Sequence, residues 1–235
     1  MKSASSVHQL ASSACVAAVF CFVCSPALLA AQPPPEVSQD GLHLQKSTKS
    51  TLVYMKPGAT WTQYSKVAIL DCFVDFDKNW QRDYNSSQIS SSNRVSESDM
   101  NRIKNDVASE FKKVFTKQLQ AKGGYQVVDA AGPDVLIVRP AIINVRVTAP
   151  DLMTAGISRT VVRSAGSATL YLELWDSATN TILARAMDAK ADPGFAGRGQ
   201  TADRVTNTMA ADDILRGWAD RLRKYLDAAR AKPAE

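Results

Sequence analysis

The stretch 133–147 reads PDVLIVRPAIINVRV and is the most concentrated run of β-branched residues in the chain. We interpret it as a long central strand. Both parities of its first half are apolar, which is typical of a strand covered on both faces. Beyond Ile142 one parity turns polar at Asn144, Arg146 and Thr148, so we expect one face to emerge into solvent. Pro140 argues against a fully central position, because proline cannot donate a ladder hydrogen bond.

Other segments have the pattern of strands that accompany this one. The strongest is 64–76, whose alternation predicts a single unbroken strand, and weaker candidates lie at 51–55, 125–129, 167–175 and 181–188. The last two are joined by a turn at 176–180. A connection that short requires antiparallel neighbours.

Two amphipathic helices are predicted. The first runs from 96 to 122: Ser96 is a suitable N-cap, apolar residues recur at three- and four-residue steps, and Gly123-Gly124 ends it. The second covers about 202–230. We therefore predict a single α+β (mixed α/β) domain at 51–230, in which an about five-stranded, mostly antiparallel or mixed sheet is backed by two long helices.

The N-terminal segment 1–31 has the features of a secretory signal peptide. Lys2 is the only charge before Glu36, an apolar core follows, and small residues end it. A retained membrane anchor is the alternative, although the apolar run is short for a span. Export places the protein in the periplasm or outside the cell, with outer-membrane association possible. We expect a flexible, proline-rich and polar lead-in at 32–50 and a tail at 231–235.

The reactive residue types are few. Beyond the signal segment only Cys72 and His43 remain, which excludes the common structural zinc sites and leaves no histidine-rich metal centre. Cys72 lies among apolar residues and is expected to be an inert thiol. Without Lys2 there are 27 basic and 23 acidic residues, spread along the chain, so no nucleic-acid surface is indicated.

A glycine-rich segment, 194–201, superficially matches two phosphate-binding patterns. It reads GFAGRGQT, with Gln200 where a P-loop has its lysine. The preceding strand belongs to a hairpin and no strand follows the next helix, so a dinucleotide-binding unit is not formed either. We interpret the segment as a hinge into the last helix. No cofactor is predicted.

The order of these motifs resembles a known family. Tyr64-Ser-Lys-Val-Ala-Ile-Leu-Asp71, the long helix, Gly124-Tyr-Gln-Val-Val-Asp129, the start of the central strand, Leu170-x-Leu-x-Leu-Trp-Asp176 and a terminal helix with Trp218 are similar to DUF3313, a bacterial cell-envelope family generally described as lipoproteins. The resemblance covers roughly 40–230. It implies an envelope protein without established catalytic residues. This chain lacks the lipid-attachment cysteine, which favours a soluble periplasmic or secreted form.

We therefore predict a non-enzymatic binding or accessory module, with no catalytic, cofactor-binding or metal-binding residues. A protein or envelope component is expected to dock on a sheet face bearing Asp71, Asp75, Asn144 and Arg146, or on the loops 79–93 and 149–160. The alternative is a periplasmic hydrolase or small-ligand carrier that uses the carboxylates of Asp71, Asp75 and Glu173. Surface ion pairs with Arg139, Arg146 and Arg185 are the simpler explanation of those carboxylates. A carboxylate with a raised pKa in a pocket would favour the alternative.

Overall fold

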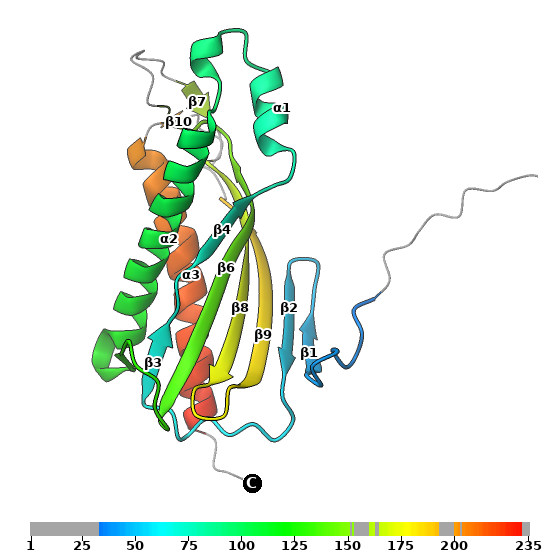
Figure 1. Ribbon diagram of the computed structural model, residues 1–235, viewed down its shortest axis with the longest axis vertical. Helices are drawn as coiled ribbons and strands as arrows, with labels where there is room; N and C mark the ends of the chain where they lie inside the picture. The colour runs from blue at the N-terminus through cyan, green and yellow to red at the C-terminus, as the bar shows by residue number, and fades with distance from the viewer. Residues whose placement is uncertain are drawn as a thin grey trace, which may run out of the picture. The chain divides into compact units, whose positions relative to one another are not determined.

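A computed structural model describes residues 33–150, 152, 160–162, 165–192, 200–202 and 204–231. The signal segment, most of the glycine-rich segment, most of the loop 149–160 and nearly all of the tail lie outside these residues. The described strands form an eight-stranded sheet in the order β1-β2-β9-β8-β6-β3-β5, with β4 also paired to β6, and β7 and β10 form a separate two-stranded sheet (Figure 1). The strands are β1 His43–Ser47, β2 Thr51–Met55, β3 Lys66–Ile69, β4 Phe73–Phe76, β5 Gln126–Val127, β6 Val135–Val147, β7 Thr160–Val162, β8 Gly166–Asp176, β9 Thr181–Ala191 and β10 Gln200–Ala202.

The helices lie between and after these strands. They are α1 Trp80–Ser86, α2 Glu97–Gln120 and α3 Arg204–Arg230, with short 3-10 turns η1 Ser91–Asn93 and η2 Ala121–Gly123. The mixed α/β class and the two long helices agree with the sequence, but the sheet is larger than the five strands expected. The segment 79–93, expected to be a loop, contains α1 and η1. The expected lead-in contains β1.

Strand β6 occupies the centre of the sheet, and it is irregular at Asn144. It pairs antiparallel with β8 on one side and parallel with β3 and β4 on the other. Its register with β8 shifts between Ile143 and Arg146, where Asn144 has φ 53°. This bulge reverses the parity, so Val145 returns to the buried side. Asn144, Arg146 and Thr148 are exposed, as expected, but the bulge places them on the face opposite to the one that Ile142 buries.

The predicted strand 64–76 is interrupted. β3 last pairs at Ile69↔Val138 and β4 first pairs at Phe73↔Ala141, so the gap lies opposite Pro140. Proline has no backbone N–H to offer a neighbouring strand, which explains why the ladder breaks at this place in a buried central strand. Because the parity changes across the break, Leu70 and Phe73 are exposed, at 44% and 61%.

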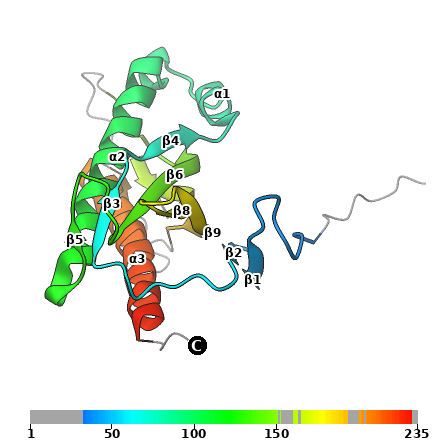
Figure 2. The same ribbon diagram turned by 60° about the horizontal axis from the view of Figure 1, so that its bottom comes forward.

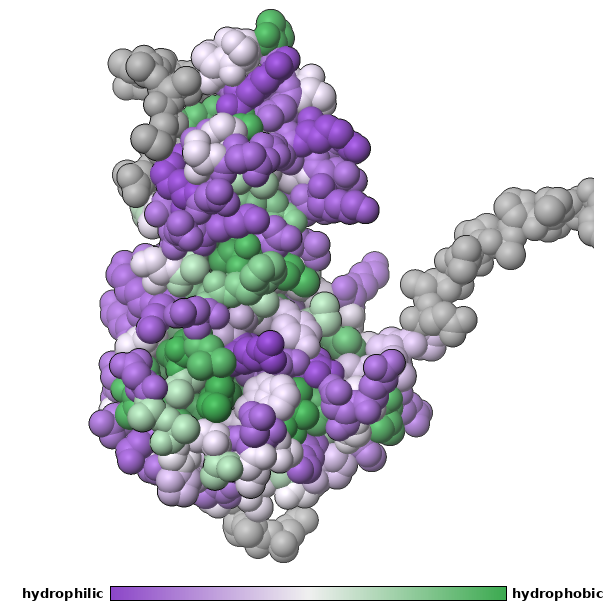
Figure 3. All heavy atoms as spheres, viewed as in Figure 1, coloured by the Kyte–Doolittle hydropathy of each residue, from purple (hydrophilic) through white to green (hydrophobic). Residues whose placement is uncertain are grey.

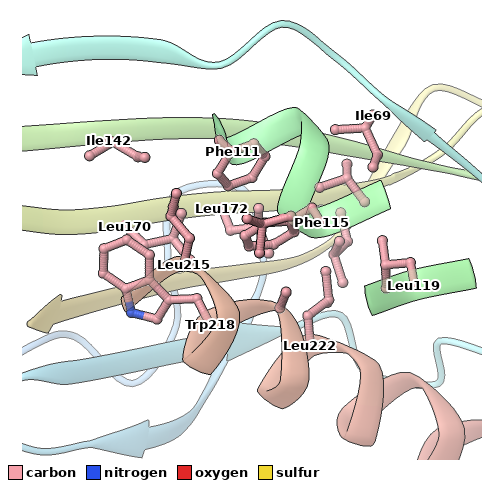
Figure 4. Close-up of a cluster of buried hydrophobic side chains, with 14 of the residues drawn as sticks. Ile69, Phe111, Phe115, Leu119, Ile142, Leu170, Leu172, Leu215, Trp218 and Leu222 are labelled. Carbon is pink, nitrogen blue, oxygen red and sulfur yellow. The ribbon is translucent and has the colours of Figure 1, made fainter. Parts of the chain in front are cut away.

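Both long helices cover one face of the sheet (Figures 1 and 2). Ser96 caps α2 as predicted and forms a reciprocal capping box with Asp99. Side chains of α2 and α3 meet over β3, β6 and β8 in one core, shown in Figure 4 and formed in part by Phe111, Phe115, Leu119, Leu215, Trp218, Leu222, Ile142, Leu170 and Leu172. Burying this much apolar surface is the main stabilising contribution to the fold.

A buried polar group also ties α3 to the sheet. Asp188 of β9 accepts hydrogen bonds from Trp218 Nε1 at 2.7 Å and from Thr51 Oγ1 at 2.5 Å, and Arg221 Nη2 lies 2.8 Å from its Oδ2. A carboxylate buried in this way needs such partners.

Among the described residues, no helix is long and apolar enough to cross a membrane.

Candidate functional site

The face of the sheet opposite α2 and α3 carries the candidate site, which we call the open face. The cross-strand register aligns Phe73, Ala141, Tyr171 and Met187 in an apolar row across β4, β6, β8 and β9. The neighbouring row is charged and places Arg139, Glu173 and Arg185 side by side. In Figure 3 hydrophobic surface gathers over β4 and the middle of β6, with hydrophilic surface adjoining it.

Glu173 is the centre of the charged row and is only 6% exposed. Its Oε1 accepts hydrogen bonds from Tyr171 Oη at 2.6 Å and from Arg185 Nε at 3.1 Å, and its Oε2 accepts one from Trp175 Nε1 at 3.1 Å. Arg139 Nη1 lies 3.7 Å from Oε2. Both oxygens of the Glu173 carboxylate therefore accept hydrogen bonds from neighbouring side chains. Arg139, with a side chain 64% exposed, keeps N–H donors available to solvent.

These contacts set the protonation of the site. Burial of the Glu173 carboxyl raises its pKa, but hydrogen bonds from Tyr171, Arg185 and Trp175 outweigh burial, so the net pKa is lowered. Burial, with the neighbouring Glu173 carboxylate, raises the pKa of Tyr171 to about 12. At neutral pH the site thus holds an ionised glutamate and a neutral tyrosine. Neither is poised for proton transfer near pH 7.

The described residues before β2, 33–50, form an N-terminal arm that covers one edge of the open face. Leu42, Tyr54 and Ile182 form a small second core there, and Tyr54 Oη donates a 2.8 Å hydrogen bond to the Pro35 carbonyl. Arg185 pairs with Asp40 of the arm as well as with Glu173. The arm is therefore fixed to the same ion-pair network that organises the charged row.

The four residues expected to form a docking face are not gathered in one place. Asp71 lines a shallow hollow between the β3–β4 break and α2. Asp75 turns to α2, where Lys104 Nζ lies 2.8 Å from its Oδ1, and this hydrogen bond lowers the Asp75 pKa. Arg146 pairs with Asp77 at 3.1 Å, and Asn144 forms the β6 bulge. Of the ion pairs expected for these carboxylates, those of Glu173 with Arg139 and Arg185 are present, whereas Asp75 pairs with Lys104 and Arg146 pairs with Asp77.

The carboxylates proposed for an alternative hydrolase are likewise separate. Asp75 pairs with Lys104 and Glu173 with Arg185, and both have lowered pKa values, the opposite of what a general acid needs. Burial raises the pKa of Cys72 to about 12, which keeps its thiol protonated, and His43 is exposed on β1. No three His, Cys, Asp or Glu side chains converge as metal ligands within the described part of the chain.

Comparison with known proteins assigns a family. The model of DUF3313, described as a protein of unknown function, matches residues 37–222. The chain belongs to DUF3313. This confirms the resemblance carried by the sequence motifs, and the match extends over the open face, α2 and most of α3 of this DUF3313 member. No curated protein shows a significant match to the chain.

Several solved structures are loosely similar to this DUF3313 chain. The PelC dodecamer from Paraburkholderia phytofirmans is 10% identical with a TM-score of 0.37, covering 74% of this chain and 98% of the other. The hypothetical protein CT253 from Chlamydia trachomatis is 9% identical with a TM-score of 0.35, covering 70% and 99%. A putative neuraminyllactose-binding hemagglutinin homolog from Helicobacter pylori is 13% identical with a TM-score of 0.33, covering 72% and 94%. Similarity at this level says nothing about a shared function.

Proposed function

We propose that the protein is exported to the cell envelope and acts as a non-catalytic binding module whose protein partner docks on the open face. The observation that carries this proposal is the pairing of an exposed apolar row with a preorganised charged row. Phe73 is 61% exposed within this row, and a contiguous apolar patch bordered by charged side chains is typical of a protein-contact surface. Export rests on the N-terminal sequence.

The chemistry of the face defines the partner. Glu173 is saturated by Tyr171, Trp175 and Arg185, so a partner gains nothing from contacting it. Arg139 is the exposed charge of the row. A complementary partner presents an apolar side chain to Phe73 and a carboxylate to Arg139, because an exposed guanidinium binds carboxylates with directed hydrogen bonds.

Photocrosslinking in the living cell tests the docking surface. A photoreactive amino acid at Phe73 is compared with the same group at Ile89, which is 104% exposed but lies in the segment between α1 and η1. We expect one discrete protein adduct from position 73, lost on Arg139→Glu, and none from position 89. Equal adducts at both positions, or an adduct that survives Arg139→Glu, would contradict the proposal.

Export is tested separately, so that the two parts can fail independently. N-terminal sequencing of protein from fractionated cells is expected to find the chain in the envelope fraction, beginning close to residue 31 or 32. A cytoplasmic chain beginning at its first residues would overturn export without affecting the docking surface.

A further inference from the structure

The helix layer contains a cavity that is distinct from the open face. It has a volume of about 310 Å³ and lies between α2, α3 and the end of the sheet formed by the last part of β6 and the first part of β8. Its size is at the lower end of the range for small-molecule sites, roughly 300–1,000 Å³. The N-terminal halves of α2 and α3 lie at the same end of the sheet (Figure 1). They form the walls of the cavity.

Small side chains create the cavity. Further along α3 the space over the sheet is filled by Trp218 and Leu222, against Phe111 and Phe115 of α2. About two turns before Trp218 on α3, the cavity is lined by Ala210 and Ala211, and Ala168 of the sheet also lines it. The walls are completed by Ile103, Val107, Ile142, Val145 and Ile214. Placing an alkyl chain against these apolar walls would remove its surface from water, which is favourable.

Among the polar residues of the lining, Asn207 carries a buried hydrogen-bond acceptor. Asn207 donates from Nδ2 to the Ala149 carbonyl at 3.0 Å, which fixes the orientation of its amide. Its Oδ1 is buried and accepts no hydrogen bond from the described residues. A buried acceptor without a donor is destabilising, so this atom favours a ligand that brings a hydroxyl or N–H group.

The charges at the rim favour an uncharged ligand. Arg102 lies between Asp99, with Nη2–Oδ1 at 3.5 Å, and Asp106, with Nη1–Oδ2 at 3.9 Å, so its charge is compensated. The other cation of the described lining, Arg146, pairs with Asp77 at 3.1 Å, Glu110 of the lining pairs with Lys113 at 2.9 Å, and Asp192 is a further carboxylate there. An anionic headgroup would therefore compete with carboxylates that already pair with Arg102 and Arg146.

We propose that this cavity binds an uncharged amphiphile: an alkyl chain between α2, α3 and the sheet, with a terminal hydroxyl that donates to Asn207 Oδ1. The chain occupies the space left by Ala210 and Ala211, and the hydroxyl satisfies the buried acceptor. This site is independent of the docking surface on the opposite face of the sheet.

Matched probes test the proposal by calorimetry and by the fluorescence of Trp218, which lines the cavity. Decanol and methyl nonyl ether are isomers that differ in the hydroxyl donor. We expect saturable one-to-one binding of decanol, about tenfold tighter than the ether, as one hydrogen bond of about 1.4 kcal/mol requires. Decanoate at pH 8 is expected to bind at least tenfold more weakly than decanol.

Variants locate the binding. Ala211→Phe fills the cavity and should weaken decanol at least tenfold, whereas Ala228→Phe, exposed near the end of the same helix, should leave it unchanged. Asn207→Leu should abolish the preference for decanol over the ether. Circular dichroism and thermal melting establish that each variant is folded. Undiminished binding to Ala211→Phe, a preference that persists in Asn207→Leu, equal affinity for decanoate, or no saturable decanol binding would each overturn the proposal.

Discussion

At the scale of single residues, two glycines differ in whether the surrounding structure has room for a side chain. Gly166 begins β8 with φ 152°, and a Cβ there would lie 2.0 Å from the Arg146 carbonyl oxygen. Gly217 is exposed within α3, and a Cβ there would meet nothing within 4 Å. The same substitution should therefore have opposite effects at the two positions.

Gly166→Ala is expected to lower the free energy of unfolding by about 2 kcal/mol or more, because β8 must move away from the β6 backbone. Gly217→Ala should raise it by about 0.5–1 kcal/mol, since alanine is the better helix former. Denaturant unfolding measures both. A stable Gly166→Ala protein would mean that the close approach to Arg146 does not exist in solution.

Glu173 makes stability depend on pH in a defined direction. Its pKa is lowered in the folded protein, so it contributes stability above the unfolded pKa of about 4.3, and this contribution is lost as pH falls through the folded pKa. Glu173→Gln should cost about 2–3 kcal/mol at pH 7, because Arg185 loses its buried partner, and the difference from wild type should shrink towards pH 3.

Unfolding at pH 7, 5 and 3 measures this difference, and a double-mutant cycle with Arg185→Met isolates the contribution of the pair. A difference between wild type and Glu173→Gln that stays constant over this pH range would show that the ionised carboxylate is not what stabilises the site.

At the scale of elements, the β6 bulge depends on the backbone of Asn144. Its φ of 53° lies in the left-handed region, which asparagine tolerates better than most residues and glycine adopts freely. Asn144→Ala should destabilise the protein by about 1 kcal/mol, whereas Asn144→Gly should be close to neutral. Thermal unfolding compares the two, and equal losses would point to a side-chain contact instead of the backbone.

The elements set by local pattern were predictable from the sequence. The capped helix α2, the central run of β6 and the β8–β9 hairpin follow from periodicity, capping and a short turn. The β3–β4 break was not predictable from 64–76 alone, because it depends on Pro140 in a strand some 70 residues later. The short, exposed β1 gives little alternation to detect.

The candidate site was only partly visible in the sequence for the same reason. The strand candidate 167–175 is present as part of β8, where Tyr171 and Trp175, each two residues from Glu173, donate hydrogen bonds to its carboxylate. The exposure of Phe73 could not be predicted without knowing that the alternation of inward and outward side chains changes at the β3–β4 break. Predicting that Asp40 pairs with Arg185 would have required knowing where the N-terminal arm lies.

At the scale of the whole molecule, the N-terminal arm is held through Arg185 and Tyr54. Asp40→Ala removes one of these attachments while leaving the helix-side core untouched. Hydrogen exchange should therefore quicken at Leu42 and Leu44, whose N–H groups bond within the arm, and stay unchanged in β6 and β8. Faster exchange throughout the sheet would show that the arm supports the entire fold.

The position of β2 has a consequence for how the chain reaches its final form. Thr51 and its partner Asp188 are 137 residues apart in sequence, so β2 cannot join the sheet until β9 is available. Closing so large a loop is slow, whereas the β8–β9 hairpin needs only a short turn. We expect the segment from α2 to β9 to assemble first and the β1–β2 hairpin to dock last. During synthesis the β1–β2 hairpin therefore waits for almost the entire remaining chain before it can join the sheet.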